Sequence, residues 1–415
     1  MIEQITLTNG VRILTEPMEG VRSAALGVWV GAGSRHETAG ENGSAHFIEH
    51  MVFKGTEKRS AAGIAQEMDA IGGQVNAFTS KENTCFYVRA LDIHLPQAAD
   101  VLCDMFFHSA FRQEDVETER GVVLEEIGMY ADNPEDVCAE RLAAAVYKGS
   151  PLARPILGRP ATLEKMTGES LRAWRDAHYR PEETVVALAG SFSGADVEDL
   201  KARFSAMAPS PLRKARAAAY QSAVTLKKKA IEQNHLTLAF PGLTYGDNRR
   251  FALQLLSFIL GGGMSSRLWQ EVREERGLCY SIYSYGAGHE DTGLFGIYTA
   301  LSRETEREAL EAILTQVRAL VQDGVTEEEL SRAREQSKAS VLMGLESTQS
   351  RMNHLGRSAL LTGEVMGPDE IIAAYDAVTR EDVLDLARMV FDPRQAALSA
   401  VGRVETEAYY REILS

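Results

Sequence analysis

Cysteine and long apolar runs are scarce in this sequence. Its 415 residues include 4 cysteines, which lie far apart and without CxxC spacing: Cys85, Cys103, Cys138 and Cys279. This excludes a zinc ribbon or a disulfide framework and predicts buried free thiols. No apolar run reaches the roughly 18 residues that span a bilayer, and the first residues lack the basic and apolar regions of a secretion signal. We therefore expect a cytoplasmic protein that does not enter membranes.

Basic residues are also fewer than acidic ones. The chain has 44 Lys and Arg against 59 Asp and Glu, for a formal net charge of −15. Nucleic acids and anionic membranes are bound through a basic face, so neither is expected as a partner. Hydrophobic residues make up 45% and charged residues 25%, which is typical of a globular protein. Cationic partners fit this charge balance better.

The chain is organised as two similar halves. Strand-like runs followed by helices occur once before and once after a stretch rich in Pro, Lys, Arg and Ala, APSPLRKARAAAYQ. Two segments align at a constant offset of 212 residues. The matching pairs are Thr167 and Thr379, Glu169 and Glu381, Pro181 and Pro393, and Gly190 and Gly402. We predict an α+β fold with two similar domains, 1–208 and 222–415, joined by a linker over 209–221.

The stretch AHFIEHMVFKGT, residues 45–56, places two histidines four residues apart. On a helix His46 and His50 project from one face, so both ring nitrogens can approach one Zn²⁺ ion to about 2.0–2.1 Å. Glu49 lies beside them, where its carboxylate can act as a general base without being a ligand. The alternative is a helix start that carries solvated or core histidines, and a third ligand is needed to decide.

The segment VETERGVVLEEIGMY, residues 116–130, offers that third ligand. A catalytic zinc ion keeps three protein ligands and one open position. At about 100° per residue, Glu119 and Glu126 share a stripe that we expect to pack inward, whereas Glu125 points to the side. The apolar members of this stripe are Val116, Val122, Val123, Met129 and Tyr130. Buried carboxylates need a cationic neighbour, which is either a metal ion or, for Glu119, an arginine.

The motif HFIEH, followed 76 residues after His50 by Glu126 within ERGVVLEE, resembles the inverted-zincin peptidase family. That family includes pitrilysin, insulin-degrading enzyme and the mitochondrial processing peptidase, whose β subunit is the most similar type. The resemblance covers nearly the whole chain. It implies two domains, each a mainly antiparallel sheet packed with helices, that enclose a substrate chamber. It also implies Zn²⁺ on His46, His50 and Glu126, with Glu49 as the base and Glu119 as a supporting acid.

The resemblance extends to residues that bind substrate. GGQVNAFTSKENT, residues 72–84, resembles the family's edge strand, along which an extended peptide adds as a further strand. Asn76, Ala77 and Phe78 would line that site. The alternative is an ordinary hairpin strand with Phe78 in the core.

Further candidates follow from the same resemblance. VREERGLCYS in the second half resembles a segment whose Arg and Tyr reach the substrate, here Arg273 and Tyr280, to steady charge on the tetrahedral intermediate. From the residues alone, Arg273 is a charge on a helix surface. Asp136 and Glu140 would contact an arginine just before the cleaved bond. A solvated acidic face explains these two acids equally well.

These features predict a zinc-dependent endopeptidase that hydrolyses extended peptides, with a preference for basic segments. One chain holds half the domains of the long single-chain relatives, so the resemblance implies a dimer, and we expect a homodimer. The alternative is a catalytically inactive binding or assembly subunit of the same fold. A structural zinc module is disfavoured because no cysteine is placed to close the coordination.

Overall fold

The computed structural model describes residues 2–209 and 215–414, which divide into two compact units. The first unit is Met1–Ile127, Arg154–Arg216 and Met343–Gly367, and the second is Gly128–Ala153, Ala217–Leu342 and Pro368–Ser415. These units differ from the predicted halves because one segment of each half belongs to the other unit. Residues 210–214 of the predicted linker lie outside the described residues.

The first unit contains a six-stranded sheet in the order β1-β2-β6-β3-β5-β4. Only the β2–β6 pair is parallel, so the sheet is mainly antiparallel, as predicted. The strands are β1 (Glu3–Thr6), β2 (Arg12–Pro17), β3 (Ser23–Val30), β4 (Gln74–Thr79), β5 (Thr84–Leu91) and β6 (Thr184–Gly190).

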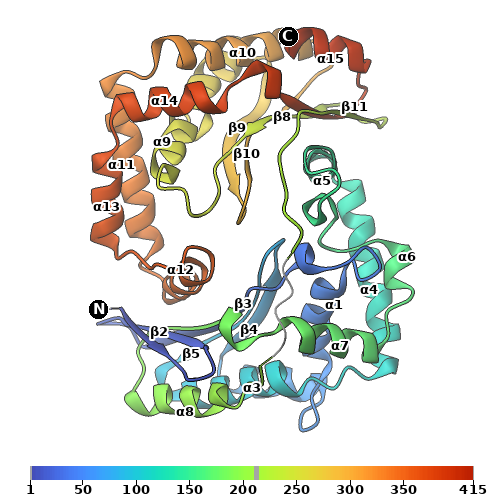
Figure 1. Cartoon of the computed structure of the whole chain (residues 1–415), viewed down its shortest axis with the longest axis vertical. Helices are drawn as coiled ribbons and strands as arrows, with labels where there is room; N and C mark the ends of the chain where they lie inside the picture. The colour runs from blue at the N-terminus through green and yellow to red at the C-terminus, as the bar shows by residue number, and fades with distance from the viewer. Residues whose placement is uncertain (1, 210–214, 415) are drawn as a thin grey trace. The chain divides into compact units, whose positions relative to one another are not determined.

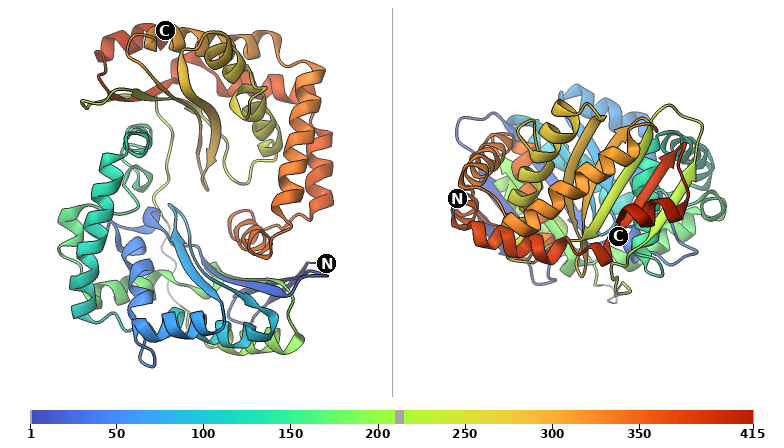
Figure 2. Two further views of the ribbon diagram at one scale, coloured as in Figure 1. Left: turned by 180° about the vertical axis from the view of Figure 1, so that it is seen from behind. Right: turned by 90° about the horizontal axis from the view of Figure 1, so that it is seen from above.

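Helices pack on both faces of this sheet (Figure 1, Figure 2). One face buries the main core, in which Phe47 and Ile48 meet Val28 and Leu102. The helices around this core are α1 (Ser44–Met51), α2 (Ala61–Ala70), α3 (Leu95–His108), α4 (Gln113–Asp132), α7 (Gly168–His178) and α8 (Gly194–Ser205), and the short helix α6 (Pro160–Leu163) precedes α7 in the chain. The other face packs α12 (Thr348–Leu361), which comes from the second half of the sequence.

The second unit contains a five-stranded sheet in the order β7-β11-β8-β10-β9, with only β7 and β11 parallel. Its strands are β7 (Val224–Lys228), β8 (Asn234–Pro241), β9 (Cys279–Gly288), β10 (Gly293–Leu301) and β11 (Ala397–Gly402). One face is packed by α9 (Arg250–Gly261), and α5 (Pro134–Val146) from the first half of the sequence packs on β8 and β11 (Figure 1). The remaining helices are α10 (Glu306–Asp323), α11 (Glu327–Gly344), α13 (Pro368–Ala377), α14 (Arg380–Val390) and α15 (Glu407–Leu414).

The repeat seen in the sequence reappears in local geometry. Thr167 and Thr379 each cap a helix, accepting from the amides of Ser170 and Asp382. Pro181 and Pro393 each begin a 3-10 turn. The paired glycines end equivalent strands with left-handed φ angles of 119° at Gly190 and 142° at Gly402. The α+β fold with two similar domains is therefore confirmed, and each sheet borrows one helix from the other half of the sequence.

Two expectations drawn from scarcity can be compared with the structure. The four cysteines are free, with Cys85, Cys103 and Cys138 buried and Cys279 half-buried. This confirms the prediction of unpaired, largely buried thiols. Within residues 2–209 and 215–414, no helix has the length and apolar character to cross a membrane.

Candidate active site

Helix α1 carries the two histidines and is fixed to the core by the residues between and beside them. Phe47, Ile48 and Met51 are buried, which orients His46, Glu49 and His50 toward another side of the helix. The helix starts after Gly43, whose φ is 103°. A Cβ at Gly43 would lie 2.9 Å from the main chain of Gly158, so only glycine permits this close approach.

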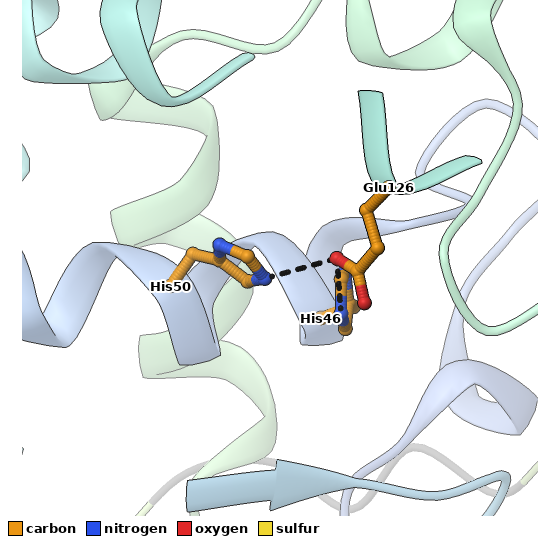
Figure 3. Close-up of side chains that lie close together, drawn as sticks. All are labelled: His46, His50 and Glu126. Atoms are coloured by element: carbon orange, nitrogen blue, oxygen red, sulfur yellow. Dashed lines mark ion pairs between the residues drawn. The ribbon is translucent and has the colours of Figure 1, made fainter. Parts of the chain in front are cut away.

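Helix α4 brings Glu126 to the histidines, as Figure 3 shows. Oε2 of Glu126 lies 3.5 Å from Nε2 of His46 and 3.3 Å from Nε2 of His50. One ligand atom from each residue lies within 4.8 Å of the others. Ligands placed tetrahedrally at about 2.1 Å from a zinc ion are about 3.4 Å apart, so the spacing suits that ion.

Two polar atoms of this cluster are available to coordinate a metal ion. Burial and the neighbouring His50 lower the pKa of His46 to about 3, so its imidazole is neutral and keeps a lone pair for a ligand. Within the described chain, Oε2 of Glu126 is buried without a hydrogen-bond partner. Two imidazoles and one carboxylate form the donor set of a catalytic zinc site, and the residues fit this ion.

Glu119 fixes the orientation of His50. Its side chain is buried, and its Oε1 accepts from Nδ1 of His50 at 2.8 Å, which leaves Nε2 directed at Glu126. Lys54 forms an ion pair with the other oxygen of Glu119. The cation beside Glu119 is therefore a lysine rather than the arginine considered from the sequence. Lys54 was missed, although its position four residues after His50 was a usable signal.

The predicted inward stripe of α4 was too wide. Val116, Glu119 and Val123 are buried, whereas Val122, Met129 and Tyr130 are exposed. Val122 and Met129 lie about 120° or more from Val116 around the helix, so they fall outside the face that packs. Glu125 is exposed while Glu126 is half-buried, which agrees with the preference for Glu126.

Glu49 is a carboxylate in a poorly solvated setting. Burial raises the pKa of Glu49, and contacts with Thr79 and His50 oppose this only in part. Its Oε2 is buried and has no hydrogen-bond partner among the described residues. Thr79 ends strand β4, so the edge of the sheet lies against the acid. A carboxyl group with a raised pKa next to a metal-ligating set is suited to proton transfer.

Strand β4 lies at one end of the sheet, paired with β5 alone in the strand order. Asn76 is exposed, and Ala77 is buried on the core side. Phe78 packs edge-on to Trp29 at a ring-centroid distance of 5.3 Å, on the α12 side of the sheet. The strand thus has the edge position that the resemblance implied, while the Phe78 side chain packs into a core. Contact of these residues with a peptide remains a prediction.

The other predicted site residues belong to the second unit. Arg273 lies on a π-helical segment, Trp269–Glu275, and its guanidinium lies 3.8 Å from the ring centroid of Trp269 and 5.2 Å from that of Tyr280. Tyr280 is 74% exposed, so its hydroxyl is accessible to a ligand. Within the second unit these two side chains are therefore neighbours.

The acidic candidates Asp136 and Glu140 lie on α5. Asp136 is half-buried and accepts a hydrogen bond of 2.6 Å from the side chain of Asn133 at the helix start. Glu140 is exposed. The helix-capping contact of Asp136 fits the reading of a solvated acidic face, and contact with a substrate arginine stays a prediction.

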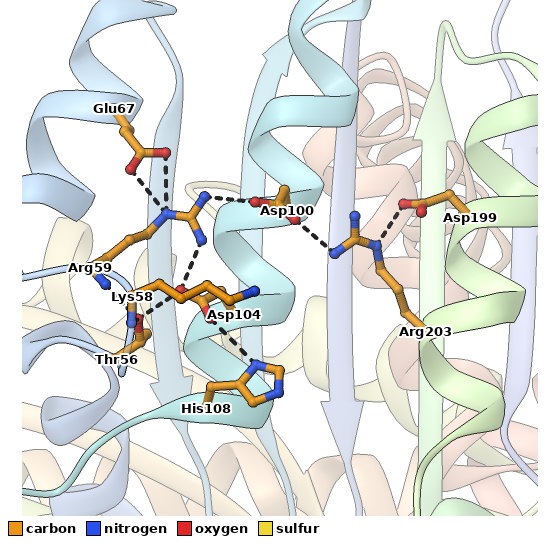
Figure 4. A network of polar contacts seen from close by, with 9 residues as sticks. All are labelled: Thr56, Lys58, Arg59, Glu67, Asp100, Asp104, His108, Asp199 and Arg203. Carbon is orange, nitrogen blue, oxygen red and sulfur yellow. Dashed lines mark hydrogen bonds and ion pairs between the residues drawn. The ribbon is translucent and has the colours of Figure 1, made fainter.

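The segment that leaves α1 is tied to α3 by a network of charges (Figure 4). Thr56 donates to the buried Asp104 at 2.7 Å, and Arg59 pairs with the same carboxylate at 2.8 Å. Further members extend the network: Arg59 to Glu67 and Asp100, and Arg203 to Asp100 and Asp199. The end of the histidine helix is thereby held against a neighbouring helix.

A repeated α+β architecture whose first unit gathers two histidines and a glutamate, with Glu49 beside them, is that of a metallopeptidase. The sequence profile of Insulinase (Peptidase family M16) matches residues 12–159, and that of the Peptidase M16 inactive domain matches residues 165–337. The chain belongs to the M16 family of zinc peptidases, the family that the sequence resemblance had indicated.

Bacterial relatives share nearly the whole length of the chain. A protein of Bacillus subtilis named uncharacterized zinc protease is 44% identical over 392 residues, covering 94% of this chain and 96% of its own. A protein of Streptomyces coelicolor with the same description is 41% identical, covering 97% of this chain and 89% of its own.

Solved structures share the fold. A peptidase M16 inactive domain from Pseudomonas fluorescens superposes with a TM-score of 0.90 at 21% identity, covering 98% of this chain and 99% of its own. A protease from Helicobacter pylori gives a TM-score of 0.89 at 20% identity, covering 97% of this chain and 99% of its own.

Proposed function

We propose that this protein is a zinc-dependent endopeptidase that cleaves extended peptides. The observation that carries the proposal is the placement of Glu126, whose Oε2 lies 3.3 Å and 3.5 Å from the Nε2 atoms of His50 and His46. These three residues would hold the metal ion, with Glu119 and Lys54 fixing the imidazole of His50. When bound, the zinc ion supplies Lewis acidity that polarises the scissile carbonyl.

Glu49 is the proton carrier of the proposed reaction. Its carboxylate takes a proton from the attacking water molecule and delivers it to the nitrogen of the leaving amine. The raised pKa that burial gives Glu49 favours both transfers, because it brings the acid nearer to neutral pH. The poorly solvated position also keeps the proton from exchanging with bulk water.

The substrate is proposed to add to β4 as a further strand, held by main-chain hydrogen bonds beside Asn76, Ala77 and Phe78. Arg273 and Tyr280 of the second unit are proposed to donate hydrogen bonds to the charge that develops on the carbonyl oxygen. Asp136 and Glu140 are proposed to favour basic side chains in the peptide. We also propose that the working form is a homodimer, which light scattering on the purified protein would test.

Cleavage and metal content together test the function. The unmodified protein is expected to bind one zinc ion and to cut an unstructured, arginine-containing peptide, with activity lost to a chelator and restored by Zn²⁺. Glu49→Gln should keep the zinc and lower kcat by about 10²- to 10⁴-fold. Glu126→Gln should lose zinc, whereas Glu125→Gln, one residue away and exposed, should not. Zinc binding without any cleavage by the unmodified protein would point to a binding or assembly subunit.

A further inference from the structure

Glu37 is a buried carboxylate of the first unit that the proposed reaction does not use. Its side chain is 3% exposed and lies in the loop before α1. Oε2 accepts hydrogen bonds from the side-chain amide of Asn42 and the main-chain amide of Gly43, each at 2.9 Å. Oε1 accepts from the main-chain amide of Ala45 at 2.9 Å. Three N–H groups therefore converge on one carboxylate.

This arrangement supplies a cap that α1 lacks in its own sequence. The cap residue is Gly43, which has no side chain to accept from the first amides of the helix. Glu37 accepts from them instead, six residues earlier in the chain. A negative charge at a helix start is stabilising, because the unpaired amides there carry partial positive charge. Ala45, held by Oε1, directly precedes His46.

The loop that presents Glu37 is fixed from its other side. Arg154 donates to the main-chain oxygen of Glu37. The side-chain amide of Asn42 donates a second hydrogen bond, of 2.9 Å, to the main-chain carbonyl of Pro155. The main-chain carbonyl of Asn42 accepts a hydrogen bond of 2.8 Å from the hydroxyl of Thr162. The carboxylate is consequently held in place by contacts with a segment more than 100 residues away, as the separations of these hydrogen-bonded pairs show.

We propose that Glu37 is a positioning residue for zinc binding: it holds the first turn of α1 so that His46 meets His50 and Glu126. Its charge also offsets the positive end of the helix, next to which a divalent cation must bind. The inference rests on the proposed function only in taking those three residues as the zinc ligands.

The test measures zinc affinity rather than activity. Burial raises the pKa of Glu37 to about 7, against the opposing effect of its hydrogen bonds, so the comparison is made at pH 8, where the carboxylate is mostly ionised. Glu37→Gln puts an NH₂ group against a main-chain N–H. Competition with a chelator should then show the zinc dissociation constant rising about tenfold. The increase in Tm on adding zinc should also shrink.

The matched control is Glu306→Gln in the second unit. Glu306 is 1% exposed and accepts hydrogen bonds from Asn234 at 2.6 Å and Tyr410 at 2.8 Å, so it is a comparably buried, hydrogen-bonded acid. Its replacement should lower Tm with and without zinc by similar amounts and leave the zinc dissociation constant unchanged. A purely structural Glu37 would behave in the same way as this control.

The outcomes separate the two proposals. If the unmodified protein binds no zinc, the proposed function fails. If it binds zinc and Glu37→Gln binds equally tightly, only the positioning role is overturned. If Glu37→Gln fails to fold, Asn42→Ala replaces it as the test. This variant keeps the negative charge of Glu37 but removes the hydrogen bonds from the Asn42 side chain to Glu37 and to Pro155. A zinc dissociation constant raised about threefold or more supports the inference, and an unchanged one overturns it.

Discussion

The two units share an order of five strands, to which the first unit adds β1, but they differ in the helix that follows the equivalent strand. In the first unit, α1 comes after β3 and carries His46 and His50. In the second, α9 comes after β8 and is apolar, with the sequence RFALQLLSFILG. Among the described residues, a His–His–Glu group that could hold a metal occurs in the first unit.

The fold does not need the two histidines. An apolar helix fills the equivalent place in the second unit, where burial of side chains such as Leu255 and Leu256 stabilises the packing directly. The first unit instead buries His46 on α1 and, on the neighbouring helix α4, Glu119, at a cost in desolvation that hydrogen bonds and a bound cation would offset. A buried polar cluster found in one copy of a repeat therefore indicates a functional role for its residues rather than a role in stabilising the fold.

The largest effect is expected from removing a ligand in the first unit. His46→Ala should abolish stable zinc binding and lower kcat/KM by more than about 10⁴-fold, because the ion both polarises and orients the substrate. His235→Ala is the control in the second unit, where His235 bonds to the Tyr298 hydroxyl at 2.7 Å. Metal analysis and peptide cleavage check both. Equal losses in the two variants would contradict the assignment of zinc to the first unit.

The next effect concerns what the second unit contributes. Arg273→Ala and Tyr280→Phe should each lower kcat by about 10- to 100-fold with zinc content unchanged, if they stabilise charge in the transition state. Arg276→Ala is the control, since Arg276 lies at the end of the same π-helical segment and pairs with Glu271 at 2.6 Å. Steady-state kinetics on one peptide compares the three. Unchanged rates in the first two would leave the second unit without a catalytic residue.

A smaller effect is expected on stability. Asp104→Asn should lower the free energy of unfolding by about 2 kcal/mol, because the buried carboxylate accepts a hydrogen bond from the Thr56 hydroxyl and forms an ion pair with Arg59. Asp100→Asn should cost less, since Asp100 is 43% exposed in the same network. Urea unfolding followed by circular dichroism measures both. A larger cost at Asp100 would show that burial does not set the strength of this network.

The smallest effect is expected at the acids of α5. Asp136→Asn combined with Glu140→Gln should raise KM for an arginine-containing peptide by less than about tenfold and leave kcat unchanged, because exposed ion pairs contribute little. For a peptide in which the arginine is replaced by alanine, the KM of the double variant should equal that of the unmodified protein. If both peptides respond alike, the acids serve the helix rather than the substrate.

Much of the candidate site could be predicted from spacing. The interval between His46 and His50 and the preference for Glu126 over Glu125 follow from helical geometry, and the structure places all of these side chains accordingly. Val122 and Met129 were assigned wrongly to the buried face, since an even distribution of apolar residues along α4 conceals how narrow the packed stripe is. The sequence contains no indication of the role of Glu37, because two of its three hydrogen-bond donors are main-chain amides, which no residue type marks.

The sequence by itself determined which residues carry the predicted chemistry: the candidate donor atoms, the proposed base beside them and the repeat in which they occur in one half. Tertiary structure decided which distant groups meet those atoms. Glu126 reaches the histidines and Arg154 holds the loop before them only because the chain folds back. The exchange of α5 and α12 between the two halves of the sequence also cannot be predicted from local pattern, since a sheet that is apolar on both faces can be covered by helices from either half.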